Sequence, residues 1–298
     1  FTQVIFWITF TAFPIKIFLN WVLIFGNLGI PELGIKGASL STLLVQFFML
    51  FCFIFFSYYK LYSYKIFNRF WRLDIDFLKK VFLLGYPIGF TYFAETSLFT
   101  SSAIMMGWLG KVELAAHGIT MQLAGLTFMF HVGLSQASTT LVGNSYGKME
   151  DKLKLFNIAK ATLLLTTFYA FIVISLFITF PEFLLSLFLD KNLSSSHEIL
   201  NLAVLLLMFA AIFHLVDGLQ ASGLGLLRGI QDVQIPFILA LISYWIFGIG
   251  SGYMLGFIFK IGSIGIWLGM VIGLTFASIS LILRFYIKVD SINFKDKS

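Results

Sequence analysis

The sequence predicts an all-α polytopic membrane protein with eight transmembrane helices. Of its 298 residues, 59% are hydrophobic and only 11% are charged, whereas about a quarter of the residues of a soluble domain are charged. Apolar runs of about twenty residues recur along most of the chain, and each can cross a hydrocarbon core of roughly 30 Å. Because the runs are continuously apolar and do not alternate with a period of two, they indicate helices rather than the strands of a barrel.

The predicted spans follow one another with mostly short polar connections. They cover residues 3–26, 37–58, 81–107, 114–142, 158–180, 198–226, 236–259 and 263–287. Of the 20 lysines and arginines, fifteen lie in alternate connections and in the carboxyl-terminal tail, four lie on the opposite side, and Lys16 lies inside the first span. Since basic residues concentrate on the cytoplasmic side, we expect a multi-pass protein of the plasma membrane with both chain ends cytoplasmic. The same rule accounts for the net charge of +6 without a nucleic-acid partner.

An internal repeat relates the two ends of the chain. A shift of 228 positions superposes residues 30–60 on residues 258–288, and two glycines of IPELGIKGASL fall on two glycines of IFKIGSIGIWL. Parallel repeats are a known transporter architecture. The expected whole is a twelve-helix, two-lobe (6+6) transporter, with about 147 residues and four spans before Phe1.

The repeat also predicts how the chain is divided. The predicted parts are the last two helices of the amino-terminal lobe (1–58), a cytoplasmic inter-lobe linker (59–80), a carboxyl-terminal six-helix lobe (81–287) and a cytoplasmic tail (288–298).

Two acidic residues lie well inside predicted spans. Glu95 lies in the third span and Asp217 in the sixth, whereas the other twelve of the 14 acids lie in loops, at span ends or in the tail. An ionised carboxylate near the centre of a bilayer costs at least several kcal/mol, so it normally faces a cavity and binds a proton or a cation. Burial favours the neutral form, which makes protonation accessible near neutral pH. The alternative is a hydrogen-bonded or permanently protonated carboxyl group that holds helices together.

Polar neighbours accompany both acids. On a helix, Tyr92 and Glu95 share a face, and His214, Asp217 and Gln220 form a polar stripe with a spacing of three. Such a stripe suits a hydrated cavity with a proton or cation site. His214 is expected either to share the proton or to make an ordinary helix contact.

Lys16 is a third unusual residue, because it lies about ten residues from either end of its span. It follows Pro14 and precedes Asn20 by one helical turn. Two alternatives stay open for its ammonium group: it snorkels toward the interface, or it forms a buried salt bridge to an acid across the cavity.

An apolar wall for a ligand is predicted near these polar groups, because flexible methionines adapt to varied shapes. Its candidate members are Phe99, Met105, Met121, Met129 and Phe213. Packing against the core or lipid is the alternative. His131 is expected to make a local hydrogen bond. The chain has no zinc spacing, nucleotide-binding glycine loop or Ser/His/Asp arrangement, and neither an enzyme nor a cofactor is predicted.

Six motifs follow one another in a specific order. They are LNWVLIFGNLGIPELGIKGASLST (19–42), LLGYPIGFTYFAETSLF (83–99), LAAHGITMQ (114–122), GLSQASTTLVGNSYG (133–147), VDGLQASGLGLLRGIQD (216–232) and GIWLGMVIGL (265–274). This order resembles that of the multidrug and toxic compound extrusion (MATE) transporters, in their NorM-like bacterial branch. By that resemblance the chain is similar to helices 5–12 of the family, with the amino-terminal part missing.

The resemblance implies a secondary active antiporter that exports amphipathic or cationic drugs or toxic compounds in exchange for H⁺ or Na⁺. It implies that Glu95 and Asp217 bind the coupling ion, with Na⁺ as the metal alternative, and that Asn20 occupies an amide-bearing position. Lys16 stands where related proteins often have an amide, and an ammonium there could replace a bound metal cation. The expected partners are small amphipathic organic cations and membrane lipid, and a monomer is expected.

Three other functions remain as alternatives. One is a non-catalytic structural or scaffold subunit, in which loss of Glu95 and Asp217 would affect only stability. A lipid-linked oligosaccharide flippase of related fold would need a basic cavity, for which only Lys16 is available. An integral-membrane transferase is less favoured, because its catalytic groups would lie at the membrane interface and not at mid-span.

Overall fold

The computed structural model confirms the all-α class. It describes residues 2–29, 31–60, 73–149, 151–188 and 196–292, and these residues form helices and turns without a strand. They belong to two compact units, Phe1–Leu78 and Lys79–Ser298, each described here by itself. The central part of the predicted linker, 61–72, and the end of the predicted tail, 293–298, lie outside the described residues.

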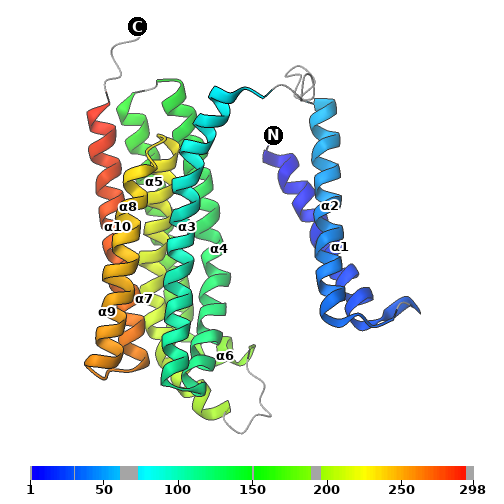
Figure 1. Cartoon of the computed structure of the whole chain (residues 1–298), viewed down its shortest axis with the longest axis vertical. Coiled ribbons are helices and arrows are strands. Elements are labelled where there is room, and N and C mark those ends of the chain that lie inside the picture. The colour runs from blue at the N-terminus through cyan, green and yellow to red at the C-terminus, as the bar shows by residue number, and fades with distance from the viewer. Residues whose placement is uncertain (1, 30, 61–72, 150, 189–195, 293–298) are drawn as a thin grey trace. The chain divides into compact units, whose positions relative to one another are not determined.

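The first unit contains two long helices (Figure 1). These are α1 (Thr2–Phe25) and α2 (Gly34–Lys60), with the short η1 (Asn27–Gly29) between them. The boundary between the units falls after the first turn of α3 (Ile75–Leu109). The second unit contains the rest of α3 and α4 (Lys111–Gly147), α5 (Lys152–Thr179), α6 (Pro181–Ser186), α7 (Ser196–Gly229), α8 (Gln234–Ile242), η3 (Ser243–Gly250), α9 (Ser251–Tyr253), η4 (Met254–Ile258) and α10 (Ser263–Ser291).

Six stretches are long and apolar enough to cross a membrane. They are Gln3–Phe25, Gly34–Lys60, Lys152–Thr179, Ser196–Gly229, Gln234–Ile258 and Ser263–Ser291. The third and fourth predicted spans fall within α3 and α4, which have 35 and 37 residues and are therefore longer than the roughly 20 residues that a crossing needs. These two helices carry more polar and small residues, so composition alone does not qualify them, and the count of eight spans stays a prediction.

In the first unit, α1 and α2 pack against each other at a close contact that glycine makes possible. A Cβ atom on Gly37 would lie 2.2 Å from the backbone oxygen of Leu23. Most other side chains of the pair are exposed, and many of them are large and apolar, which is the surface expected of helices in lipid.

The second unit is a bundle with α7 at its centre. This helix packs against α4, α5, α6 and α10, and side chains are buried all round it, as expected for a core helix. By contrast, α3 makes few close backbone approaches and reaches its neighbours through long side chains. The indole of Trp245 on η3, for example, donates a hydrogen bond to Ser97 on α3 at 2.9 Å. The wider spacing of α3 leaves room for a pocket.

A row of glycines joins the segment α8–η4 to α10. Gly265, Gly269 and Gly273 recur at every fourth residue of α10 and face the backbone of that segment. A Cβ atom on Gly269 would lie 2.3 Å from the Cα atom of Gly252, and one on Gly273 would lie 2.6 Å from that of Gly248. Small residues at this spacing let membrane helices approach closely. Two stretches of π-helix, η3 and η4, lie in this segment; such wide turns are frequent at functional sites.

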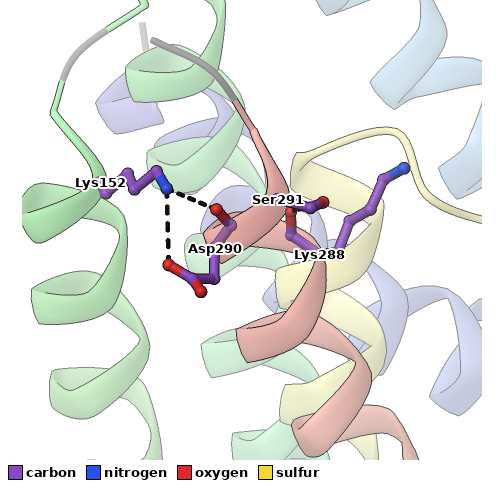
Figure 2. A network of polar contacts seen from close by, with 4 residues as sticks. All are labelled: Lys152, Lys288, Asp290 and Ser291. Carbon is purple, nitrogen blue, oxygen red and sulfur yellow. Dashed lines mark hydrogen bonds and ion pairs between the residues drawn. The ribbon is translucent and has the colours of Figure 1, made fainter.

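Two ion pairs near one end of the bundle differ in burial, and we expect them to contribute differently to the free energy of unfolding of the protein. In Figure 2 the ammonium of Lys152 lies 3.4 Å from a carboxylate oxygen of Asp290 and also donates to the Asp290 carbonyl, with both side chains substantially exposed. Arg284 Nε donates to Asp232 at 2.9 Å, and the Asp232 side chain is only 10% exposed. We expect Lys152→Ala to lower the free energy of unfolding by less than about 1 kcal/mol.

Asp232→Ala should cost more, about 3 kcal/mol, because it leaves a partly buried guanidinium without its carboxylate. Unfolding of both variants in mixed detergent micelles measures the difference. Equal losses for the two variants would show that burial does not set the strength of these pairs.

Candidate functional site

A pocket of about 210 Å³ lies between α3, α4 and α7. Its walls combine charged, amide, hydroxyl and aromatic groups. They are formed by Tyr92, Glu95, Thr96, Phe99, Phe128, Val132, Ser135, Gln136, Gln220, Ala221, Leu224 and Arg228. All of these residues belong to the second unit.

Glu95 lies on the face of α3 that the 3.6-residue period predicts. Tyr92, Thr96 and Phe99 line the same pocket, and the Glu95 side chain is only 8% exposed. Its burial follows from the helix around it, because Thr91 and Ala94 are also buried on this side of α3. The side chain of Glu95 therefore lines the pocket and is not exposed to lipid.

Asp217 lies deeper, on the central helix α7, and is 2% exposed. It does not line the pocket, but its carboxyl group interacts electrostatically with that of Glu95. Its Oδ1 atom is buried without a hydrogen-bond partner among the described residues. A buried acceptor without a partner is costly, so this oxygen is suited to a proton or a cation.

Gln220 is three residues beyond Asp217 and connects the pocket to the π-helical segment. Its side-chain amide donates a hydrogen bond to the hydroxyl oxygen of Tyr244 on η3, and both side chains are completely buried. The amide oxygen of Gln220 has no partner among the described residues. The carboxyl groups and this oxygen are the kind of ligand that hard cations such as Na⁺ prefer.

Arg228 is a pocket residue that the sequence analysis assigned to a cytoplasmic loop. It lies in the last turn of α7 and lines the pocket together with Glu95, with which it interacts electrostatically. The sequence signal for its place in the helix is the uninterrupted run of small and apolar residues that precedes it, ASGLGLL. A helix can continue through such a run beyond the end of the span that hydropathy predicts.

His214 does not line the pocket and pairs with His131 of α4. Their Nε2 atoms lie 3.1 Å apart, and both rings are completely buried. A Cβ atom on Gly218 would lie 2.5–2.7 Å from atoms of the His131 ring, so glycine at that position is what admits the ring. The expectation of a local hydrogen bond for His131 is wrong, because its partner lies 83 residues away in the sequence.

Lys16 and Asn20 belong to the first unit, and hydroxyl groups of α2 connect them. The ammonium of Lys16 donates to Ser41 at 3.2 Å and also to Thr42, and Ser41 donates to the amide oxygen of Asn20. Within the described residues no carboxylate pairs with Lys16.

The predicted apolar wall is divided between the pocket and other surroundings. Phe99 lines the pocket, and Phe213 packs behind it with ring centroids 6.0 Å apart. Met105 is buried in the core, Met121 packs against that core, and Met129 is 63% exposed. These last three methionines do not line the pocket.

Comparison with known proteins decides the family. The MatE family model matches residues 87–254, a stretch that includes every residue lining the pocket. The chain belongs to the MatE family. The part of this MatE chain that matches the family model is thus also the part that forms the pocket.

Curated relatives of this MatE chain agree with that assignment. It is 40% identical over 294 residues to the "Probable multidrug resistance protein NorM" of Agrobacterium fabrum, with 96% of this chain and 62% of that protein covered. It is also 40% identical over 287 residues to the protein of the same name in Rhizobium meliloti, with coverage of 95% and 61%. The chain therefore spans about three fifths of the length of these relatives.

Solved structures share the fold at low identity. The eukaryotic MATE transporter AtDTX14 has a TM-score of 0.78 at 18% identity, with 97% of this chain and 62% of that chain covered. A multidrug resistance MATE family transporter in an outward-facing conformation has a TM-score of 0.79 at 20% identity, with coverage of 94% and 61%. A MOP superfamily transporter from Pyrococcus furiosus has a TM-score of 0.78 at 20% identity, with the same coverage. At these identities the likeness shows a shared fold.

Proposed function

We propose that the protein is a secondary active antiporter that exports amphipathic, mainly cationic compounds in exchange for H⁺ or Na⁺. The observation that carries the proposal is a pair of buried acids: Glu95 lines the pocket, and Asp217 is buried and has an oxygen without a hydrogen-bond partner among the described residues. The multidrug-resistance names of the NorM relatives agree with it.

The proposed mechanism follows from the cost of burying charge. A carboxylate in a dry site is stable only when it is paired, protonated or bound to a cation. Binding of H⁺ or Na⁺ at Glu95 and Asp217 therefore favours the conformation in which these groups are enclosed, and release favours the hydrated one. A ligand shifts such an equilibrium only by its different affinity for the two states, and the buried acids supply that difference.

The topology is part of the same proposal. Eight spans with both ends cytoplasmic would make residues 1–58 the last two helices of an amino-terminal lobe and residues 81–287 a complete six-helix lobe, within a 6+6 transporter of the plasma membrane. Support comes from the charge asymmetry of the connections and the internal repeat. Asn20 and Lys16 would then contribute to the cavity from the first lobe. A monomer in contact with membrane lipid is the proposed working form.

Reconstituted transport tests the function directly. The full-length protein is placed in liposomes preloaded with ethidium, and either a proton gradient or a Na⁺ gradient is imposed at a constant membrane potential. We expect ethidium to move against its own gradient with one of the two ions and to stop when that gradient is collapsed with an ionophore. Equal movement with and without both gradients would contradict antiport, and movement only of a lipid-linked oligosaccharide would favour the flippase.

A further inference from the structure

The pocket contains a cation of its own. Arg228 lies in the last turn of α7 and lines the same pocket as Glu95. A pocket would bind organic cations most tightly if its own walls carried no positive charge. The guanidinium therefore requires an explanation other than the positive charge of a membrane-flanking loop.

The guanidinium is held in a defined position by Tyr92. Nη1 donates a hydrogen bond to the Tyr92 hydroxyl oxygen at 2.8 Å, and the guanidinium carbon lies 4.6 Å from the centroid of the same ring. A planar group that is both stacked and hydrogen-bonded loses little further freedom when it binds a ligand. The Arg228 side chain is therefore preorganised.

Part of the guanidinium is left without a partner. Nη2 is buried and has no hydrogen bond among the described residues. Two carboxylates are nearby, but Asp232, which shares a smaller cavity with Arg228, is already paired with Arg284 at 2.9 Å. Glu95 interacts with Arg228 electrostatically, and no direct ion pair between the two is recorded among the described residues. A buried donor without an acceptor is costly, and an acidic ligand group would satisfy it.

The rest of the pocket fits a ligand with an apolar body. Phe99, Phe128 and Leu224 provide apolar walls, and the completely buried Gln220 offers an unpartnered amide oxygen. The site therefore combines an apolar surface with one fixed negative group and one fixed positive group.

We propose that Arg228 determines whether this pocket prefers cationic or anionic ligands. Its positive charge balances the negative charge of Glu95, lowers the affinity of the pocket for organic cations and binds the carboxylate of amphipathic acids. The inference rests on the proposed function in that it treats the pocket as a ligand site. It goes further by making carboxylate-bearing compounds ligands of that site.

Two probes of equal length and opposite charge test the proposal. They are 3-phenylpropylammonium and 4-phenylbutyrate, and their binding to the purified full-length protein is measured by titration calorimetry. In Arg228→Gln we expect the ammonium probe to bind about tenfold more tightly and the carboxylate probe about tenfold more weakly. Arg228→Lys keeps the charge, so the ammonium probe should bind within about threefold of its affinity for the original protein. The carboxylate probe should bind less tightly than to the original protein but more tightly than to Arg228→Gln, because lysine keeps the charge and loses the preorganised planar group.

The matched control is Lys160→Gln, which removes an exposed cation from α5 and should change neither affinity. Opposite shifts of the two probes support the proposal, because damage to the pocket would weaken both. Parallel shifts, unchanged affinities in Arg228→Gln, or a lack of binding of both probes to the original protein would overturn it.

The same variants separate this inference from the proposed function. If ethidium export proves independent of any ion gradient while the opposite shifts persist, antiport fails and the role of Arg228 stands. If export is ion-driven and Arg228→Gln leaves both affinities unchanged, the role of Arg228 fails and antiport stands.

Discussion

Glu95→Gln and Asp217→Asn, each made alone, are expected to reduce ethidium efflux from cells to the background of cells without the protein. Both substitutions keep the size of the side chain and remove its charge. Glu95 lies at the pocket and Asp217 is 2% exposed behind it. An amide at either position cannot release a proton and carries no negative charge to neutralise a cation in the low-dielectric interior. The coupled step should therefore be lost while the protein still inserts.

The matched control for these two variants is Glu182→Gln on α6, where the side chain is exposed and efflux should be unchanged. Insertion is checked by the amount of monodisperse protein extracted from membranes. Normal efflux in both Glu95→Gln and Asp217→Asn would make these acids structural, and the coupling groups would have to lie elsewhere in the protein. Loss of extractable protein in either variant would indicate that the carboxyl group holds helices together.

Gly269→Ala is expected to lower the free energy of unfolding by about 3 kcal/mol, at the upper end of the usual cost of overpacking. The added methyl group would lie 2.3 Å from the Cα and N atoms of Gly252 and 2.9 Å from the backbone oxygen of Gly248. These are backbone atoms, which cannot move aside as a flexible side chain would. The helix pair must separate, and contacts along the whole glycine row are weakened.

The control for the glycine row is Gly118→Ala on α4, where a Cβ atom would meet nothing within 4 Å. Alanine favours a helix over glycine by up to about 1 kcal/mol, so this variant should be as stable as the original protein or more stable. Unfolding in mixed detergent micelles compares the two variants. A stable Gly269→Ala protein would show that α10 and the segment α8–η4 are free to move apart.

Much of the fold follows from composition and periodicity, because a helix in a membrane satisfies its backbone hydrogen bonds within a single segment. The bounds of α7 and α10 contain the predicted spans 198–226 and 263–287, and α5 ends at Thr179, one residue before the end of the predicted span 158–180. Neither the π-helical turns of η3 and η4 nor the contact of the glycine row of α10 with Gly248 and Gly252 has a sequence signal of the same strength. Both depend on how closely a second helix approaches.

The two acids were found because a charge inside an apolar run is unusual whatever the tertiary structure. Arg228 was missed for the opposite reason. A basic residue near the end of a span is normal, and nothing local distinguishes a guanidinium in a loop from one that reaches back into a pocket. The methionines of the apolar wall were predicted from residue type alone. Residue type does not indicate which face of a helix borders a cavity.

The sequence by itself determined that this is a helical membrane protein with two acids inside apolar runs, because hydropathy and the cost of buried charge act within a single helix. Only the tertiary structure decided which polar groups meet. Arg228 reaches Tyr92 across 136 residues, and His131 reaches His214 across 83. Such pairs depend on the spacing and rotation of packed helices, which arise from the close fit of small residues such as Gly218 between distant segments.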